Sequence, residues 1–387
     1  MDRWLRVPRW LRLTSYAVGS RLLVAIAMVA GSHRPHADDD LHWIGTDGAG
    51  FFWDQLPVRW LDVWGRWDTM FYWHLARFGY PAAHDDGSWV YHAAYFPLFP
   101  TLMRGLSVAL FGLEPYLCGV GLAFACFGLA VVYLDKLVRL DASPAFAELV
   151  VLVLLAWPGS HFLTCVYPES LALFLAVFAA YCARTGKPWV AGVACLLAAV
   201  TRASGVFVCV PVLYELLRTP EGRLRFSPRA LVVALPLLSL GAWMTLNASL
   251  YGDALYFVHV QAGWGRAPSW FWEPLARQPV LGATDARHEL SLDYHLVALA
   301  ALALAVVATR RRERPGYVAL GWLNTLLPLS TGLLRGVHRY LASNFPMFIA
   351  LARVLEARPR WRLGYLVGGT ALMLLFAFKW GGGFQPN

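Results

Sequence analysis

Residues 115–137 read PYLCGVGLAFACFGLAVVYLDKL, an apolar run with no charged residue before Asp135. About 20 apolar residues in a helix are enough to cross a hydrocarbon core roughly 30 Å thick. Similar runs recur along the sequence, in which 58% of the residues are hydrophobic and 15% are charged. A soluble domain cannot bury so much apolar surface. The sequence therefore predicts an all-α polytopic membrane protein.

Working outward from this run, we expect about eleven transmembrane helices. The first is residues 14–32, which follow four arginines and end without the small-residue site at which a signal peptide is cleaved. The others are predicted at residues 115–137, 145–163, 170–183, 189–200, 205–217, 230–250, 292–309, 317–333, 340–352 and 363–378. Because no stretch is left over for a soluble domain, residues 1–387 are expected to form a single transmembrane domain.

The first two spans are separated by a long polar, acidic and aromatic segment, and we expect residues 33–114 to form a large outer loop. Residues 95–111 of this loop are apolar but carry Arg104 in their middle, and a charge at membrane depth is costly. They are therefore predicted to be a juxtamembrane helix on the outer surface. A second helix is predicted at residues 59–78. One apolar face of that helix would leave Asp68 at its border, with Asp62 and Arg66 on the solvated side.

The basic residues predict the orientation of the chain. They concentrate in the connections that this topology leaves in the cytoplasm, most densely at residues 310–314, as the positive-inside rule requires. The net charge of +9 is then explained by anionic inner-leaflet lipids, so no nucleic-acid partner is implied. We expect an integral plasma (inner) membrane protein whose large loop lies on the non-cytoplasmic side.

The sequence lacks the motifs of several common classes of enzyme and transporter. It has no P-loop, no Gly-x-Gly-x-x-Gly after a strand and no His-Glu-x-x-His, which argues against a nucleotide-driven pump, a dinucleotide enzyme or a zincin. The six cysteines form no Cys-x-x-Cys pair and are predicted to be packing residues. Histidines and aspartates gather at residues 33–42, but their spacing matches no specific metal site, and we expect neither a metal nor another cofactor.

Polar residues converge on the predicted outer side. Asp68 is a candidate general base, with a simple surface acid as the alternative. Arg202 lies in a break between two short spans, and Arg335, His338 and Arg339 precede another span. Because guanidinium groups bind phosphate oxygens bidentately, these cations are predicted to bind the phosphate of a lipid. The alternative is a structural ion pair with Glu169 or Asp68.

At these residues the chain resembles a bacterial form of the PIG-V type mannosyltransferases of the GT-C superfamily. The resemblance runs from about residue 60 to residue 350. It is carried by Trp67-Asp68 with Phe71, Gly79-Tyr80, Tyr95-Phe96-Pro97-Leu98-Phe99-Pro100, Tyr167-Pro168-Glu169-Ser170, Thr201-Arg202-Ala203-Ser204-Gly205, the segment from Gln261 to Arg266, Arg339-Tyr340 and Phe345-Pro346. One departure is Ala203-Ser204, where Ala-Asn is expected in relatives, which puts the family's polar contact there in doubt.

The resemblance implies a GT-C type fold and a transferase that uses a polyprenyl-phosphate-linked mannose, with its catalytic aspartate in the first outer loop. This aspartate corresponds to Asp68. We expect an inverting transfer of mannose to a lipid or glycan acceptor on the non-cytoplasmic face. The remaining predicted roles are donor-phosphate binding by Arg202, Arg335, His338 and Arg339, and sugar or acceptor binding by Glu169, Trp67, Gln261, Arg266 and Tyr340.

Two other classes of function stay open at this point. A sugar-lipid transporter would be built from paired, similarly interrupted halves, and no convincing internal repeat is present. A non-catalytic membrane subunit would have no need of an intact Asp68. Within the transferases, a sugar such as arabinose is an alternative to mannose, and the acceptor has no signature in the sequence.

Overall fold

The computed structural model describes residues 7–33, 59–83, 88, 90–219, 221–277 and 292–383. Within these residues the chain is helical, without a β-strand and with a single isolated β-bridge between Arg218 and Leu224. The chain divides into two compact units. Unit 1 comprises Met1–Arg77, Phe99–Phe174 and Ala352–Asn387, and unit 2 comprises Phe78–Leu98 and Leu175–Leu351.

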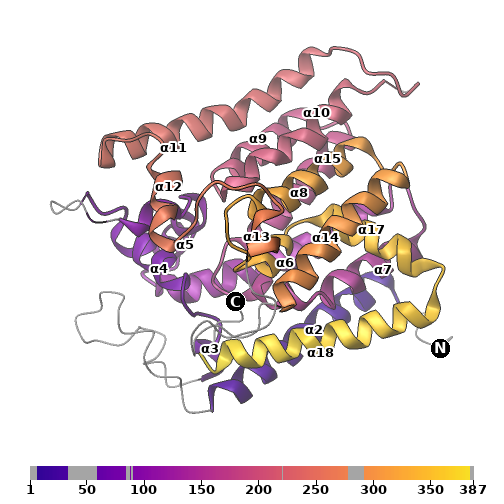
Figure 1. Cartoon of the computed structure of the whole chain (residues 1–387), viewed down its shortest axis with the longest axis horizontal. Coiled ribbons are helices and arrows are strands. Elements are labelled where there is room, and N and C mark those ends of the chain that lie inside the picture. Colours follow the sequence, from indigo (N-terminus) through magenta and orange to yellow (C-terminus); the bar gives the residue numbers. More distant parts are fainter. Residues whose placement is uncertain are drawn as a thin grey trace. The chain divides into compact units, whose positions relative to one another are not determined.

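Unit 1 is built around the long helices at the two ends of the chain. Its helices are α2 (Arg9–Ser32), α3 (Arg59–Asp62), α4 (Thr69–Phe78), α5 (Leu98–Ala109), α6 (Pro115–Val138), α7 (Pro144–Leu155), the 3-10 helix η3 (Pro158–Thr164) and α18 (Pro359–Gly381). Helices α2 and α18 lie side by side (Figure 1). Two further helices, α8 (Glu169–Arg184) and α17 (Phe345–Glu356), run from one unit into the other.

Glycines allow α2 and α18 to approach closely. A Cβ atom on Gly31 would lie 1.9 Å from the carbonyl oxygen of Phe378, and one on Gly381 would lie 1.8 Å from that of Met28. Small residues at helix contacts are typical of membrane bundles, where close packing replaces the hydrophobic effect as the main source of association. The crossing of α2 and α18 therefore depends on these two positions.

Replacing Gly31 with alanine should lower the free energy of unfolding by about 1–3 kcal/mol, because the added methyl group meets backbone atoms that cannot rotate away. The matched control is Gly19→Ala on the same helix, where a Cβ would meet nothing within 4 Å. That variant should be as stable as the wild type or slightly more stable, since alanine favours the helix. Thermal unfolding in detergent checks the prediction, and equal melting temperatures for the two variants would contradict it.

The first two arginines of α2 are ion-paired inside unit 1. Arg12 lies 2.8 Å from Glu148, and Arg9 contacts both Asp135 and Glu148. Tyr16 donates a hydrogen bond of 2.9 Å to the other oxygen of Glu148. These contacts join α2 to α6 and α7, so the basic residues at the start of the first span are part of the packed structure.

Unit 2 contains the remaining helices. They are η2 (Tyr91–Ala94), α9 (Pro188–Ala199), η4 (Ala203–Val208), α10 (Cys209–Leu217), η5 (Pro228–Ala234), α11 (Leu235–Tyr251), α12 (Tyr256–His259), η6 (Val260–Trp264), α13 (Glu273–Arg277), α14 (Leu292–Arg310), α15 (Pro315–Leu329) and α16 (Val337–Leu341). Helix α9 packs against α11, and α15 packs against both α10 and α14.

The membrane character that the sequence predicts is confirmed, whereas the count of eleven spans is not. Among the residues that the structure describes, five helical segments are long and apolar enough to cross a bilayer: Arg9–Ser32, Pro115–Val138, Pro228–Tyr251, Asp293–Arg310 and Pro359–Gly381. A sixth span results if α7 and η3, which are bent by 86° at their junction, are taken as one. The other predicted spans correspond to shorter helices.

Two predicted helices are interrupted. The run at 145–163 bends after Trp157, because Pro158 has no N–H group and disfavours a helical residue before it. The run at 59–78 was expected to be one helix, and this is wrong: α3 ends at Asp62 and α4 begins at Thr69. Trp67 between them has φ +41°, which a helix cannot include. Arg66, expected on a solvated face, is 5% exposed.

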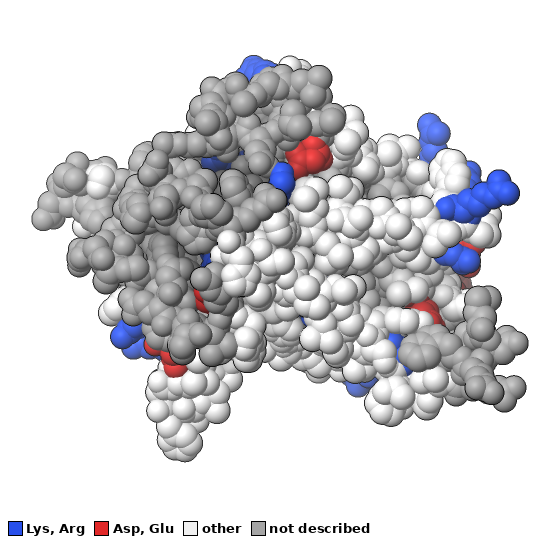
Figure 2. Space-filling view, turned by 90° about the horizontal axis from the view of Figure 1, so that it is seen from below, with Lys and Arg blue, Asp and Glu red and all other residues white. Residues whose placement is uncertain are grey.

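The surface is also that of a membrane protein. Much of the face shown in Figure 2 carries neither basic nor acidic side chains. Trp10, Trp189 and Trp361 are 63 to 71% exposed, and each lies in the first turn of its helix, α2, α9 or α18. Tryptophan at helix ends is typical of the boundary between lipid and water in membrane proteins.

Candidate active site

Asp68 lies at the start of α4 in unit 1. Its carbonyl oxygen accepts the first backbone hydrogen bond of this helix from Tyr72 N, at 3.3 Å. Its own N–H group donates to the hydroxyl of Tyr167 at 3.2 Å. The residue is half-buried. A carboxylate here lies at the N-terminal end of a helix, where the helix dipole favours negative charge.

The turn that carries Asp68 is held by aromatic side chains from elsewhere in unit 1. Tyr116 donates to the carbonyl oxygens of Leu61 and Asp62 at 2.8 and 3.0 Å. The ring of Trp67 meets the ring of Trp380 edge to face, with 4.9 Å between their centroids. A Cβ atom on Gly65 would lie 2.5 Å from the Tyr116 ring, so the chain passes this ring only because residue 65 is glycine.

Glu169 is connected to the turn that carries Asp68 through Tyr167, two residues before it in the sequence. It is the first residue of α8 and is 2% exposed. Two residues earlier, the Tyr167 hydroxyl contacts the backbone on both sides of Trp67. Hydrogen bonds therefore join the Trp67-Asp68 segment to the segment from Tyr167 to Ser170. Asp68 and Tyr167 are 99 residues apart in the sequence.

Three arginines meet at one tyrosine ring in unit 2. The guanidinium carbons of Arg202, Arg266 and Arg339 lie 5.3, 5.6 and 5.0 Å from the centroid of the Tyr340 ring. Arg266 and Arg339 also donate to the Tyr340 hydroxyl, each at 3.3 Å. We call Arg202, Arg266 and Arg339 the arginine cluster.

Backbone breaks and short hydrogen bonds position the arginine cluster. Arg202 is extended, with φ −167°, in the gap between α9 and η4 that the sequence predicts, and it contacts the Ser343 hydroxyl at 3.4 Å. Arg266 donates to Thr331 Oγ1 at 2.7 Å and to the carbonyl of Arg335 at 2.9 Å. Because like charges repel at such short range, this arrangement suits the binding of an anion.

The other predicted site residues of unit 2 differ in their burial and in their contacts. His338 is 2% exposed, and its Nε2 lies 3.3 Å from Asp293 Oδ2. The side chain of Arg335 is exposed, and its carbonyl oxygen accepts a hydrogen bond from Arg266. Gln261 lies in η6 and accepts a hydrogen bond of 3.2 Å from Arg266 N.

Three residues that contact the predicted site residues were not themselves predicted from the sequence. Tyr167 lies two positions before Glu169 in a segment that carries the family resemblance, and this position could have indicated its role. Asp293 and Thr331 belong to no motif, and their roles as partners of His338 and Arg266 follow from tertiary contacts alone.

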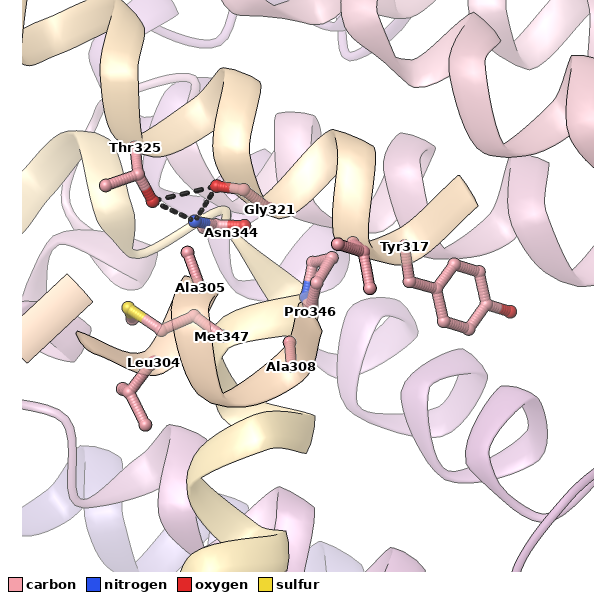
Figure 3. A pocket seen from close by; sticks show the side chains of 10 residues that line it. Leu304, Ala305, Ala308, Tyr317, Gly321, Thr325, Asn344, Pro346 and Met347 are labelled. Carbon is pink, nitrogen blue, oxygen red and sulfur yellow. Dashed lines mark hydrogen bonds between the residues drawn. The ribbon is translucent and has the colours of Figure 1, made fainter. Parts of the chain in front are cut away.

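A narrow, mostly apolar pocket in unit 2 is lined by residues of α14, α15 and the start of α17 (Figure 3). Asn344, next to the Arg202 partner Ser343, donates to Gly321 O at 3.3 Å and to Thr325 Oγ1 at 3.2 Å at one side of it. Other lining residues are Leu304, Ala305, Ala308, Pro346 and Met347, from α14 and the start of α17.

No metal site is visible in the part of the chain that the structure describes, where no three His, Cys, Asp or Glu side chains are grouped to hold an ion. Most of the acidic and histidine-rich stretch at 33–42 lies outside the described residues. The cysteines agree with the predicted packing role, since five of the six are buried and Cys209 is partly buried.

Comparison with known proteins identifies a family. A family model described as Mannosyltransferase (PIG-V) matches residues 11–219. No curated protein matches the sequence. The similar solved structures include the Archaeoglobus fulgidus oligosaccharyltransferase in complex with Zn and sulfate, with 14% identity, a TM-score of 0.41 and coverage of 83% of this chain and 49% of that chain.

Another similar structure is the archaeal oligosaccharyltransferase AglB from Archaeoglobus fulgidus in complex with an inhibitory peptide and a dolichol-phosphate. It has 12% identity and a TM-score of 0.42, with coverage of 95% of this chain and 56% of that chain. The present chain thus spans about half the length of these structures.

Proposed function

Because the chain belongs to the mannosyltransferase (PIG-V) family, we propose that it transfers mannose from a polyprenyl-phosphate-mannose donor to a lipid or glycan acceptor on the non-cytoplasmic face of the plasma membrane. The observation that carries this proposal is the arginine cluster around Tyr340. The family makes the chain a glycosyltransferase, and the cluster favours a donor whose leaving group is a phosphate.

The arginine cluster would bind the donor phosphate. Guanidinium groups form paired, charge-assisted hydrogen bonds with phosphate oxygens. As the bond between the anomeric carbon and the phosphate oxygen breaks, negative charge grows on the departing polyprenyl phosphate, and prepositioned cations stabilise it.

Asp68 would act as the general base. The acceptor hydroxyl oxygen attacks the anomeric carbon from the face opposite the phosphate, and Asp68 accepts the hydroxyl proton as the new glycosidic bond forms. One displacement of this kind inverts the anomeric centre. Glu169, Trp67 and Gln261 are proposed to hold the sugar or the acceptor. With three cations for the leaving phosphate, this scheme assigns no step to a metal ion.

The proposed donor can be tested directly. The purified protein in nanodiscs, supplied with a lipid extract from cells that lack the gene, should transfer radiolabelled mannose from polyprenyl-phosphate-mannose and none from GDP-mannose. Mass spectrometry of glycolipids and glycoproteins from the same cells should show a species short of one hexose. Transfer from GDP-mannose alone, or transfer of arabinose from its polyprenyl phosphate in place of mannose, would contradict the proposed donor.

The proposed sidedness predicts that Ser88 is outside and Arg311 is inside. Both side chains are exposed, and the basic run at 310–314 is the strongest orientation signal. In a Cys209→Ser background, an impermeant maleimide should label Ser88→Cys in intact cells and Arg311→Cys only after the membrane is opened. The five remaining native cysteines are buried. Labelling of Arg311→Cys alone in intact cells would reverse the topology.

A further inference from the structure

We propose that Tyr167 is a positioning residue for Asp68: its hydroxyl clamps the backbone on both sides of Trp67 and so fixes where the Asp68 carboxylate is presented. This inference rests on the proposed role of Asp68 as the general base. Tyr167 itself is not assigned to the chemistry, and all the contacts that support its role lie within unit 1.

The clamp consists of two hydrogen bonds to one hydroxyl group. The Asp68 N–H donates to Tyr167 Oη at 3.2 Å, and Tyr167 Oη donates to the Arg66 carbonyl at 3.0 Å. These two backbone groups flank a single residue, Trp67. The hydroxyl thus fixes the positions of the peptide groups before and after Trp67 relative to each other.

Trp67 needs such a restraint because of its backbone conformation. Its φ of +41° lies in the left-handed region, which a bulky side chain rarely adopts and which persists only where surrounding contacts enforce it. The Trp67 ring is supported by Trp380, whose Nε1 donates to Val63 O at 2.7 Å. If the hydroxyl clamp is lost, the turn can relax toward ordinary φ values, and this rotation moves Asp68.

Tyr167 is rigid enough to act as a clamp. It is 2% exposed, and its ring stacks on Phe162 at 5.8 Å and meets Trp380 edge to face at 5.5 Å. The preceding residue, Val166, donates from its N–H to Trp64 O at 3.0 Å. The Tyr167 segment is therefore fastened to the 63–68 turn at a second point, and the hydroxyl has little freedom to follow a moving backbone.

The test is Tyr167→Phe, which keeps the packed ring and removes only the hydroxyl. Displacement of a catalytic group by about 1 Å can cost about a hundredfold in rate. We expect kcat for mannose transfer to fall by about ten- to a hundredfold, with KM for polyprenyl-phosphate-mannose and the affinity for polyprenyl phosphate, used as the binding probe, both within about twofold of wild type.

The matched control is Tyr365→Phe. The Tyr365 hydroxyl donates to Val153 O at 3.1 Å in the same unit, so this variant also loses one hydrogen bond between a phenol and a carbonyl, at a position that does not contact the 63–68 turn. It should keep the wild-type kcat. If Tyr167→Phe fails to fold, Thr69→Val replaces it, because Thr69 Oγ1 is buried and accepts from Arg66 N at 3.2 Å in the same turn. This variant should also lower kcat without weakening probe binding.

Asp68→Asn is measured in the same series, so that the general-base role of Asp68 and the positioning role of Tyr167 are tested separately. An inactive Asp68→Asn variant together with a wild-type kcat for Tyr167→Phe would overturn the clamp and leave the base in place. An active Asp68→Asn variant would overturn the base and, with it, the clamp. A fall in kcat that is matched by weaker probe binding would show that Tyr167 supports the fold or the donor site, which also overturns the positioning role.

Discussion

Asparagine at position 68 should abolish transfer while the protein stays folded. The amide has the size of the carboxylate but cannot accept the proton of the attacking hydroxyl, and a positioned general base contributes about 10²- to 10⁴-fold to a rate. Asp68 precedes the first residue of α4, a place where asparagine is as favourable as aspartate. Loss of activity should therefore be accompanied by an unchanged melting temperature.

The measurement is mannose transfer from polyprenyl-phosphate-mannose in nanodiscs, with Asp62→Asn as the control. Asp62 is the last residue of α3, six positions before Asp68. Its carbonyl oxygen accepts hydrogen bonds from the Tyr116 hydroxyl, the Arg66 guanidinium and the Gly65 N–H group. We expect that variant to keep most of its activity. Near-normal turnover by Asp68→Asn would remove Asp68 from the mechanism, and equal losses in both variants would indicate damage to the turn as a whole.

The boundaries of long helices could be predicted from local sequence. The run at 115–137 becomes α6, Pro115–Val138, because proline is well suited to a first helical position and an uninterrupted apolar stretch follows. The apolar periodicity at 59–78 was misleading. Hydrophobic spacing does not reveal that Gly65 packs under Tyr116 or that Trp67 adopts a positive φ, and both depend on contacts with distant residues.

The sequence was enough to select the arginines of the candidate site, but it did not show that they lie together. Arg202, Arg339 and Arg266 were all expected, but in two separate roles. Their convergence on Tyr340 depends on contacts such as that between Arg202 and Ser343, which are 141 residues apart. Local sequence does not show which distant residues come into contact, so the arginine cluster could be recognised only in the structure.

Gly205 shows how one family segment places its arginine. A Cβ atom at this position would lie 1.7 Å from the carbonyl oxygen of Ala198, so η4 can fold back onto the end of α9 only with glycine here. This close approach leaves Arg202 extended in the gap between the two helices.

The second large effect is expected at Arg339, whose guanidinium carbon is the nearest of the arginine cluster to the Tyr340 ring. Arg339→Gln should lower kcat/KM for polyprenyl-phosphate-mannose by about 10²- to 10³-fold, the range found when one group that stabilises a developing oxyanion is removed. Arg339→Lys should fall between this variant and the wild type, because lysine keeps the charge but loses the planar fork that fits a phosphate.

Steady-state transfer at varied donor concentration checks this prediction, with binding of polyprenyl phosphate as a second readout. The control is Arg277→Gln, which removes the charge of an arginine of unit 2 that is 76% exposed and pairs with Glu273; it should change kcat/KM less than about twofold. If Arg339→Gln binds the lipid phosphate normally and loses only turnover, the cluster acts on the transition state rather than on the bound donor. If neither quantity changes, the donor phosphate binds elsewhere, because a guanidinium in contact with it could not be removed without cost.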